Sequence, residues 1–294
     1  MQYRLWRATA SLLGRLPLRL SYALADVLGW LGFWLWPRGR RATIANFRHV
    51  LAGHPEREIR RTARRSLQGY CRYLVDFARF SAASSGPQPT EAALEGVFEQ
   101  LDELLVRSKG AVIVCTHFGN WDAGAAVTAA RGYDATVIGE SFGDHRLDAL
   151  VFGARERSGV KVVSMDHAGP SLIRGLKRGG LLALLIDRPT PGSGVAVNFF
   201  DAIVEVPAGP ARLARASGAA LVPVAFPRIS PHRPEVAILA DFSIPFERTS
   251  DADADIQRLT QAALRAHEGF IRRYPEQWYM FREFWPRTPS GAAG

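Results

Sequence analysis

A histidine and an aspartate lie close together in the segment THFGNWD at residues 116–122. His117 directly follows the apolar run AVIVCT, which is typical of a buried strand, and Asp122 falls in the first turn of a helix-compatible stretch. A tight turn at Gly119 then brings the carboxylate onto one imidazole nitrogen, where it fixes the tautomer and stabilises the imidazolium. The second nitrogen is left to take a proton from a hydroxyl, so the pattern predicts a general base. Asn120 either caps the helix or contacts substrate.

Strand candidates alternate with helix candidates along the body of the chain. The strands are short apolar runs at 111–116, 136–139, 161–165, 181–187, 221–226 and 236–240. The helices are expected at 121–130, 144–157, 171–178 and 253–273. This alternation predicts an α/β fold with a mostly parallel sheet flanked by helices. Ligands of such sheets gather at the carboxyl ends of the strands, where His117 and Asp187 both lie.

The composition is that of an ordinary globular protein. The chain has 294 residues, of which 47% are hydrophobic and 22% charged, so disordered and fibrous classes are excluded. Its two cysteines, Cys71 and Cys115, cannot build a disulfide framework, and no Cys/His cluster has zinc spacing. We therefore expect a reducing, cytoplasmic setting and no metal site.

The net charge of +9 is unevenly distributed along the chain. Residues 1–80 contain 15 arginines and four acidic groups, which gives +11, and the remaining residues contain 22 basic and 24 acidic groups, which gives −2. A basic end on a nearly neutral body indicates an anionic membrane surface rather than nucleic acid as partner.

The N-terminal quarter contains an apolar, tryptophan-rich segment from Leu16 to Trp36. Its uninterrupted part, Val27–Trp36, is shorter than the ~20 residues that span a bilayer. Tryptophans suit the bilayer interface, and arginines flank the segment on both sides. We expect a helical segment at 1–41 that lies on or dips into the cytoplasmic face of the cell membrane, as a peripheral or single-pass protein. The alternative is a helix buried against the body.

Two further regions complete the predicted organisation. Glu56–Phe80 has helical periodicity, and its arginines between Arg57 and Arg65 either contact lipid phosphates or nucleic acid or form a solvated face. Ser81–Thr90 is a linker by composition. The expected division is a membrane-associated segment at 1–41, a basic helical region and linker at 42–90, and an α/β body at 91–294.

The HFGNWD block resembles the His-x4-Asp/Glu signature of the lysophospholipid acyltransferase superfamily, in particular its bacterial glycolipid branch. That branch includes the late acyltransferases of lipid A biosynthesis and the phosphatidylinositol mannoside acyltransferases. Four other blocks resemble the branch in order and spacing: RRATIANFRHVL, SLIRGLKRGGLLALLIDR, VPAGPARLARASGAALVPV and PEQWYMFREFW. The chain departs from the lipid A enzymes in having Asp122 in place of Glu and Arg-Pro-Thr-Pro after Asp187. It departs from the mannoside branch in lacking an acidic group near Ala196, so the acceptor stays open.

The resemblance implies an O-acyltransferase that needs no cofactor. His117, oriented by Asp122, would deprotonate a hydroxyl of a membrane glycolipid or lysolipid, which attacks the thioester of acyl-CoA or acyl carrier protein. Arg155 resembles a basic position that pairs with the dyad acid or holds a phosphate. Asp187 resembles an acidic supporting position, and Arg188 is a candidate for an anionic head group.

Two other functions are compatible with parts of the sequence. Cys115, His117 and Asp122 have the residue types of a cysteine hydrolase, and two-residue spacing places Cys115 and His117 on one side of a strand. The arginine-rich helix at 57–65 suggests a non-enzymatic nucleic-acid-binding protein, although no RNP, zinc-finger or helix-turn-helix signature accompanies it.

Overall fold

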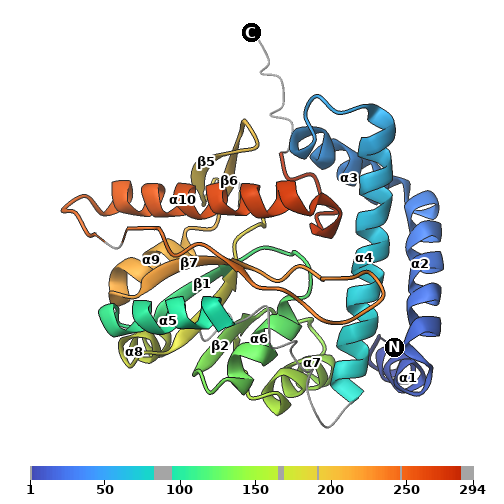
Figure 1. The fold of residues 1–294 in the computed structure, drawn as a ribbon, viewed down its shortest axis with the longest axis horizontal. Helices are drawn as coiled ribbons and strands as arrows, with labels where there is room; N and C mark the ends of the chain where they lie inside the picture. Colours follow the sequence, from blue (N-terminus) through green and yellow to red (C-terminus); the bar gives the residue numbers. More distant parts are fainter. Residues whose placement is uncertain (1, 83–94, 165–168, 191, 246, 286–294) are drawn as a thin grey trace.

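A mostly parallel β-sheet forms the centre of the computed structural model, which describes residues 2–82, 95–164, 169–190, 192–245 and 247–285. In these residues the larger sheet has the strand order β3-β2-β4-β1-β7-β8. Its strands are β1 (Ala111–Cys115), β2 (Ala135–Gly139), β3 (Lys161–Ser164), β4 (Leu181–Leu185), β7 (Ala220–Ala225) and β8 (Leu239–Ala240). All neighbouring pairs are parallel except β7 and β8. The predicted α/β class and parallel sheet are therefore confirmed (Figure 1).

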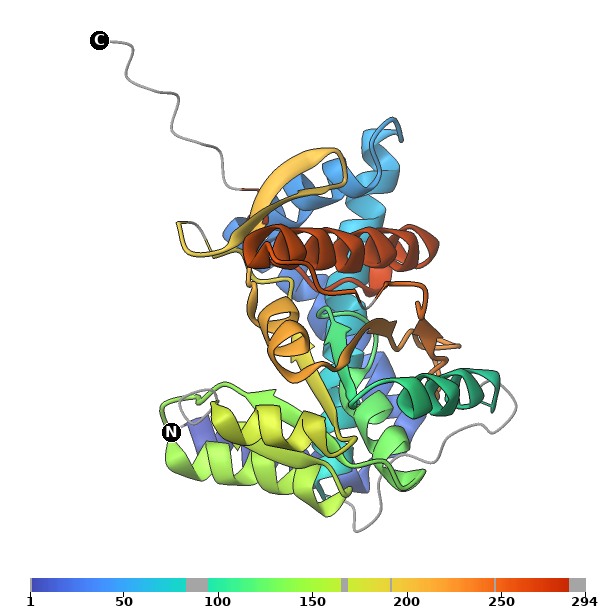
Figure 2. The same cartoon turned by 90° about the vertical axis from the view of Figure 1, so that its left-hand side faces the viewer.

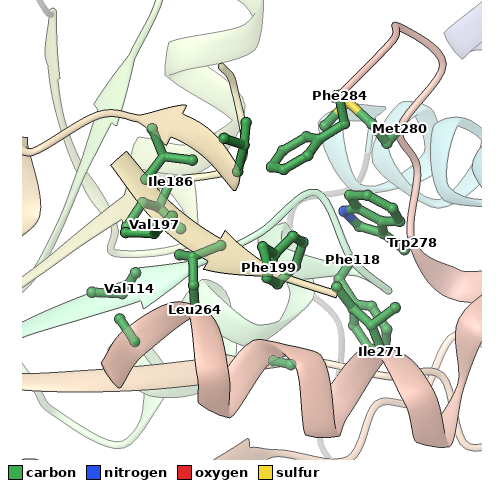
Figure 3. Close-up of a cluster of buried hydrophobic side chains, with 14 of the residues drawn as sticks. Val114, Phe118, Ile186, Val197, Phe199, Leu264, Ile271, Trp278, Met280 and Phe284 are labelled. Carbon is green, nitrogen blue, oxygen red and sulfur yellow. The ribbon is translucent and has the colours of Figure 1, made fainter. Parts of the chain in front are cut away.

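Helices cover both faces of this sheet. Alternate residues of β1 point to opposite faces, so that Val112 belongs to one buried cluster and Ala111 and Cys115 to another. One face packs against α5 (Glu95–Arg107) and α6 (Trp121–Ala130), and α7 (His145–Arg157) follows β2. The other face packs against α8 (Pro170–Lys177), α9 (Gly209–Ser217) and α10 (Ala252–Arg273). Figure 3 shows the core of this second face, into which Phe199, Leu264 and Trp278 point.

A β-hairpin that was not predicted from the sequence lies against α10. Its strands are β5 (Val195–Phe199) and β6 (Ala202–Val206), which pair antiparallel. The two turn residues, Phe200 and Asp201, have φ angles of +50° and +59°. Such turns usually carry Asn-Gly or Asp-Gly, so the sequence lacked the usual hairpin signal. The helices α5 and α9 were also not predicted.

Several predicted boundaries differ from the structure. The 236–240 run contributes only the two residues of β8, because Val236 forms an isolated bridge with Arg228 instead. Strand β4 ends at Leu185 rather than at Asp187. The linker expected at 81–90 is helical in its first two residues, since α4 continues to Ala82, and the rest of it lies outside the described residues. Residue 165 of the 161–165 run also lies outside them.

Four helices form the N-terminal quarter: α1 (Gln2–Arg15), α2 (Leu18–Leu35), α3 (Pro37–Val50) and α4 (Glu56–Ala82). Pro17 directly precedes α2 and Pro37 follows it, as expected for a residue that cannot continue a preceding helix. Helices α2 and α4 run side by side at one edge of the molecule in Figure 1 and lie behind the sheet in Figure 2. In the described part of the chain, no helix is both long enough and apolar enough to cross a membrane.

Helix α2 has apolar side chains on two opposite faces. Tyr22, Ala25 and Phe33 are buried on the side that packs on the body. The other side exposes a helical stripe of large apolar residues: Leu20, Leu24, Val27, Leu28, Leu31, Trp34 and Leu35. The expected burial against the body thus describes one face of α2, and the exposed apolar face is the one compatible with a membrane. Membrane association stays a prediction. The domain division at 1–41, 42–90 and 91–294 also stays a prediction.

Close approach of α2 to α4 depends on Gly29. A Cβ atom at Gly29 would lie 2.6 Å from the Cα atom of Gln68, whereas a Cβ atom at Gly32 would lie 3.8 Å from the nearest atom, Cδ2 of Leu67. We expect Gly29→Ala to destabilise the protein by about 1–3 kcal/mol through overpacking. Gly32→Ala is the matched control and should stabilise it by about 0.4–1 kcal/mol. Urea unfolding of the two variants measures both effects, and equal stabilities would contradict the close packing.

Candidate active site

The turn after β1 is held in place by backbone hydrogen bonds from two other segments. Gly119 has φ of +64°, and a side chain at this position would collide with the carbonyl of Phe226. The amide of Gly119 donates to the carbonyl of Gln277 over 2.9 Å. The carbonyl of His117 accepts from the amide of Tyr279 over 2.8 Å. The position of His117 is thus fixed by contacts on both sides of the turn.

The imidazole of His117 pairs with Asp187. Its Nδ1 atom lies 2.7 Å from Oδ1 of the carboxylate, and the backbone amide of His117 donates to Oδ2 over 2.8 Å. The indole Nε1 of Trp278 also donates to Oδ2, over 3.0 Å. This geometry occupies Nδ1 and leaves Nε2 without a hydrogen bond to any described residue. Nε2 is therefore the ring atom available for proton transfer.

Asp187 is fully buried, and its surroundings favour the ionised carboxylate. Burial opposes ionisation, but the charge of His117 and the hydrogen bonds from His117 and Trp278 outweigh it and lower the pKa of the carboxyl. A lowered pKa means that Asp187 contributes stability above its ordinary value of ~3.9 and loses it as the pH falls through its folded value. At neutral pH the carboxylate can therefore stabilise an imidazolium.

Asp122 does not occupy the position that its spacing predicted. Its Oδ1 accepts from Nε of Arg155 over 2.7 Å and its Oδ2 from the hydroxyl of Tyr73 over 2.6 Å. The described residues include no hydrogen bond between Asp122 and His117. The reason is that α6 leaves the turn with Asp122 facing α4 and α7, whereas Asp187 follows the strand that pairs with β1. The expected His117–Asp122 contact is thus replaced by a His117–Asp187 contact.

The contacts of Asp122 keep its partners in fixed protonation states. Burial and the nearby carboxylate raise the pKa of Tyr73 well above its ordinary value, so the phenol stays a donor. Burial would lower the pKa of Arg155, but the charge of Asp122 outweighs it and raises that pKa. Of the two roles expected for Arg155, the structure shows pairing with Asp122.

The remaining predicted residues lie around this centre. Asn120 is buried and accepts from the amide of Ala123 with Oδ1, over 3.1 Å, so it caps α6. Its burial argues against a direct contact with substrate. Arg188 forms an ion pair with Glu140, and both side chains are exposed. Binding of a head group by Arg188 stays a prediction.

An apolar cavity lies between α6 and the sheet, beside the turn after β1 that carries His117. Its volume is about 90 Å³. Trp121, Asp122 and Arg155 line it near the turn, and the ring centroid of Trp121 is 5.5 Å from that of His117. It is also lined by small and aliphatic side chains such as Ala125, Ala183, Ile113, Leu181 and Leu185. The cavity is suited to a flexible apolar group.

The structure also bears on the cysteine of the hydrolase alternative. Cys115 is buried and lines the same cavity, and burial, with a contribution from Asp187, raises the pKa of its thiol to about 12. A nucleophilic cysteine needs a lowered pKa.

No group of three or more His, Cys, Asp or Glu side chains in the described residues is arranged to hold a metal ion.

Two site residues were missed in the sequence. Trp278 lies in the PEQWYMFREFW block that carries the resemblance, but the block alone assigns it no role. Tyr73 follows the helical periodicity of 56–80, where a buried tyrosine has no distinguishing signal. Both become recognisable only through the carboxylates they bind.

Comparison with known proteins identifies the family of the chain. The chain matches the family model for bacterial lipid A biosynthesis acyltransferases over residues 3–287. It is 27% identical over 235 residues to the phosphatidylinositol mannoside acyltransferase of Mycolicibacterium smegmatis, covering 76% of this chain and 71% of the relative. It is 25% identical over 225 residues to the protein of the same name from Mycobacterium tuberculosis, covering 75% and 69%. The resemblance stated from the sequence is confirmed: the chain belongs to the bacterial lipid A biosynthesis acyltransferase family and is an acyltransferase.

Proposed function

We propose that this enzyme transfers a fatty acyl group from a thioester, acyl-CoA or acyl carrier protein, to a hydroxyl of a membrane glycolipid. The observation that carries the proposal is the His117 imidazole, held at Nδ1 by a buried carboxylate and left with Nε2 available, next to an apolar cavity. The relatives are named as phosphatidylinositol mannoside acyltransferases, which supports a glycolipid acceptor.

The proposed reaction needs one base and no covalent enzyme intermediate. Nε2 of His117 takes the proton of the acceptor hydroxyl, and the oxygen attacks the thioester carbonyl. The C–O bond forms, the C–S bond breaks, and the imidazolium returns the proton to the departing thiolate. Asp187 stabilises the imidazolium without taking the proton. Asp122, with Arg155 and Tyr73, positions the start of α6 at the edge of the cavity.

Substitution of the carboxylates distinguishes Asp187 from Asp122. Asp187→Asn should lower kcat by roughly 10²- to 10⁴-fold with little change in KM, because the neutral amide no longer stabilises the imidazolium. Transfer of a labelled acyl group to a membrane lipid extract measures this effect.

Three variants serve as comparisons for that experiment. His117→Ala should abolish transfer, and Cys115→Ser should retain it, since the thiol has no role in the reaction. Asp122→Asn should act mainly through stability, because it removes the charge partner of Arg155. Normal turnover by Asp187→Asn, together with a stable but inactive Asp122→Asn, would show that Asp122 rather than Asp187 is the carboxylate that assists His117.

We further propose that the cavity holds the acyl chain of the donor. A second, smaller apolar cavity lies beside it beneath α5, with a volume of about 40 Å³. The two share a wall formed by Ile113, Thr128, Leu181 and Phe226. A chain that runs from His117 along the sheet therefore meets this wall.

Removal of part of the wall should change acyl-chain selectivity. Ile113→Ala joins the two cavities, so the preferred donor should shift to longer acyl chains, measured as kcat/KM over a series of acyl-CoA lengths. Val112→Ala is the matched control, because this neighbouring residue packs on the opposite face of β1. An unchanged profile in Ile113→Ala would show that the wall does not limit chain length.

We also propose that α2 docks on the cytoplasmic face of an anionic membrane as a peripheral element. The stripe of exposed apolar side chains described above would enter the interface, with Trp30 and Trp36 beside it. The exposed arginines Arg15, Arg19 and Arg38 near the two ends of α2 complement anionic lipids.

A charge in the stripe should abolish membrane binding. Leu24→Glu/Leu28→Glu should lose co-sedimentation with phosphatidylglycerol-containing vesicles, because two carboxylates must enter the interface. Val106→Glu is the control, since Val106 is an exposed apolar residue of α5 outside the stripe. Vesicle binding equal to that of the unaltered protein would contradict docking through α2. Tighter binding to duplex DNA at matched salt would favour the nucleic-acid alternative.

A further inference from the structure

Four buried polar side chains connect α2 to the catalytic turn. They are Tyr22 of α2, Asp76 of α4, Asn120 of the turn and Arg228 after β7, and none exposes more than 8% of its surface. The function proposed above gives none of them a direct part in the reaction. Because buried charges are costly unless paired and hydrogen-bonded, such a cluster demands a reason.

Asp76 is the centre of this cluster. Its Oδ1 accepts from the hydroxyl of Tyr22 over 2.5 Å, and its Oδ2 accepts from Nδ2 of Asn120 over 3.0 Å. Nη2 of Arg228 forms a close ion pair with the same Oδ2, and Nη1 donates to the hydroxyl of Tyr22 over 3.2 Å. Each of the three other residues thus contacts Asp76.

Asn120 transmits the position of Asp76 to the turn. It lies three residues after His117, and its backbone amide donates to the carbonyl of Phe226 over 2.9 Å. Its side chain caps α6 through Oδ1 and binds Asp76 through Nδ2. A helix cap needs only the Oδ1 contact. The Nδ2 contact is therefore additional, and it fixes the turn relative to α4.

Arg228 connects the same cluster to the other half of the catalytic pair. Its backbone amide donates to Oε1 of Gln277 over 2.7 Å, and Nε2 of Gln277 donates back to the carbonyl of Arg228 over 3.1 Å. Gln277 precedes Trp278, which binds Asp187. The carbonyl of Gln277 accepts from the amide of Gly119. The cluster thus holds the segments that fix both His117 and Asp187.

We propose that Asp76 and Asn120 are positioning residues that fix the His117–Asp187 pair relative to α2, the helix that carries the exposed apolar stripe. This inference rests on the proposed acyl transfer and deepens it. Tyr22 and Arg228 complete the connection, so that a change at α2 reaches the turn through hydrogen bonds rather than through contact with substrate.

The test uses the full-length enzyme with an acyl-CoA donor and a membrane lipid extract as acceptor. Asn120→Ser keeps the helix cap but is too short to reach Asp76, and we expect kcat to fall roughly 10- to 100-fold, the effect of a small misplacement, with the donor KM unchanged. A role limited to capping predicts normal kcat, and that result would overturn the proposal.

A matched control separates positioning from general destabilisation. Asn46 is equally buried and donates from Nδ2 to the carbonyls of Met280 and Arg282, outside the cluster. Asn46→Ser should lower the melting temperature without lowering kcat of the folded protein. Equal losses of kcat in Asn46→Ser and Asn120→Ser would show that any buried asparagine has this effect, and would overturn the proposal.

A second variant keeps the proposal testable if Asn120→Ser folds poorly. Tyr22→Phe removes a single hydroxyl in α2, and its effect on kcat should be non-additive with that of Asn120→Ser because both act through Asp76. Normal kcat in Tyr22→Phe would overturn the connection to α2. Failure of the unaltered enzyme to transfer acyl groups would instead contradict the proposed function.

Discussion

The candidate active site depends on keeping one fully buried carboxylate ionised. Asp187 has no exposed surface, so its charge is stable only with hydrogen-bond donors arranged around it. Those donors are the imidazole and amide of His117 and the indole of Trp278. The donors come from two distant parts of the chain and the carboxylate from a third, which requires β1, β4 and the segment after α10 to be in their native positions. The buried clusters on both faces of the sheet hold these elements together.

The alternation of strands and helices in the body could be predicted in part, because the strands of the larger sheet are short apolar runs, although α5 and α9 were missed. Helix α6 has the bounds that were expected, Trp121–Ala130. The β5–β6 hairpin could not be predicted, because its turn residues, Phe200 and Asp201, are unusual at positive φ. Where Phe199 and its neighbours pack is decided by the distant α10, which no local pattern reveals.

The sequence singled out both residues of the observed pair, His117 and Asp187, but not their pairing. His117 and Asp187 were each identified at a strand end, yet proximity in sequence favoured Asp122 as the partner. The register of β1 and β4 decides the pairing. Cys115 lies beside Leu185, and His117 and Asp187 each follow two positions further along their strands' direction. Register between parallel strands is set by contacts across the whole sheet, so sequence spacing does not disclose it. Likewise, the apolar 16–36 segment did not show that α2 uses one face for packing and leaves the other exposed.

The same register has a consequence for how activity arises during folding. His117 and Asp187 are 70 residues apart in the chain and meet only when β1 and β4 pair in parallel. Parallel pairing requires closure of a long loop before its contacts form, which makes it a slow, non-local step. A collapsed chain with most of its helices would still lack a paired imidazole. The His117–Asp187 pair is thus a property of the completed sheet and not of any single helix or local segment.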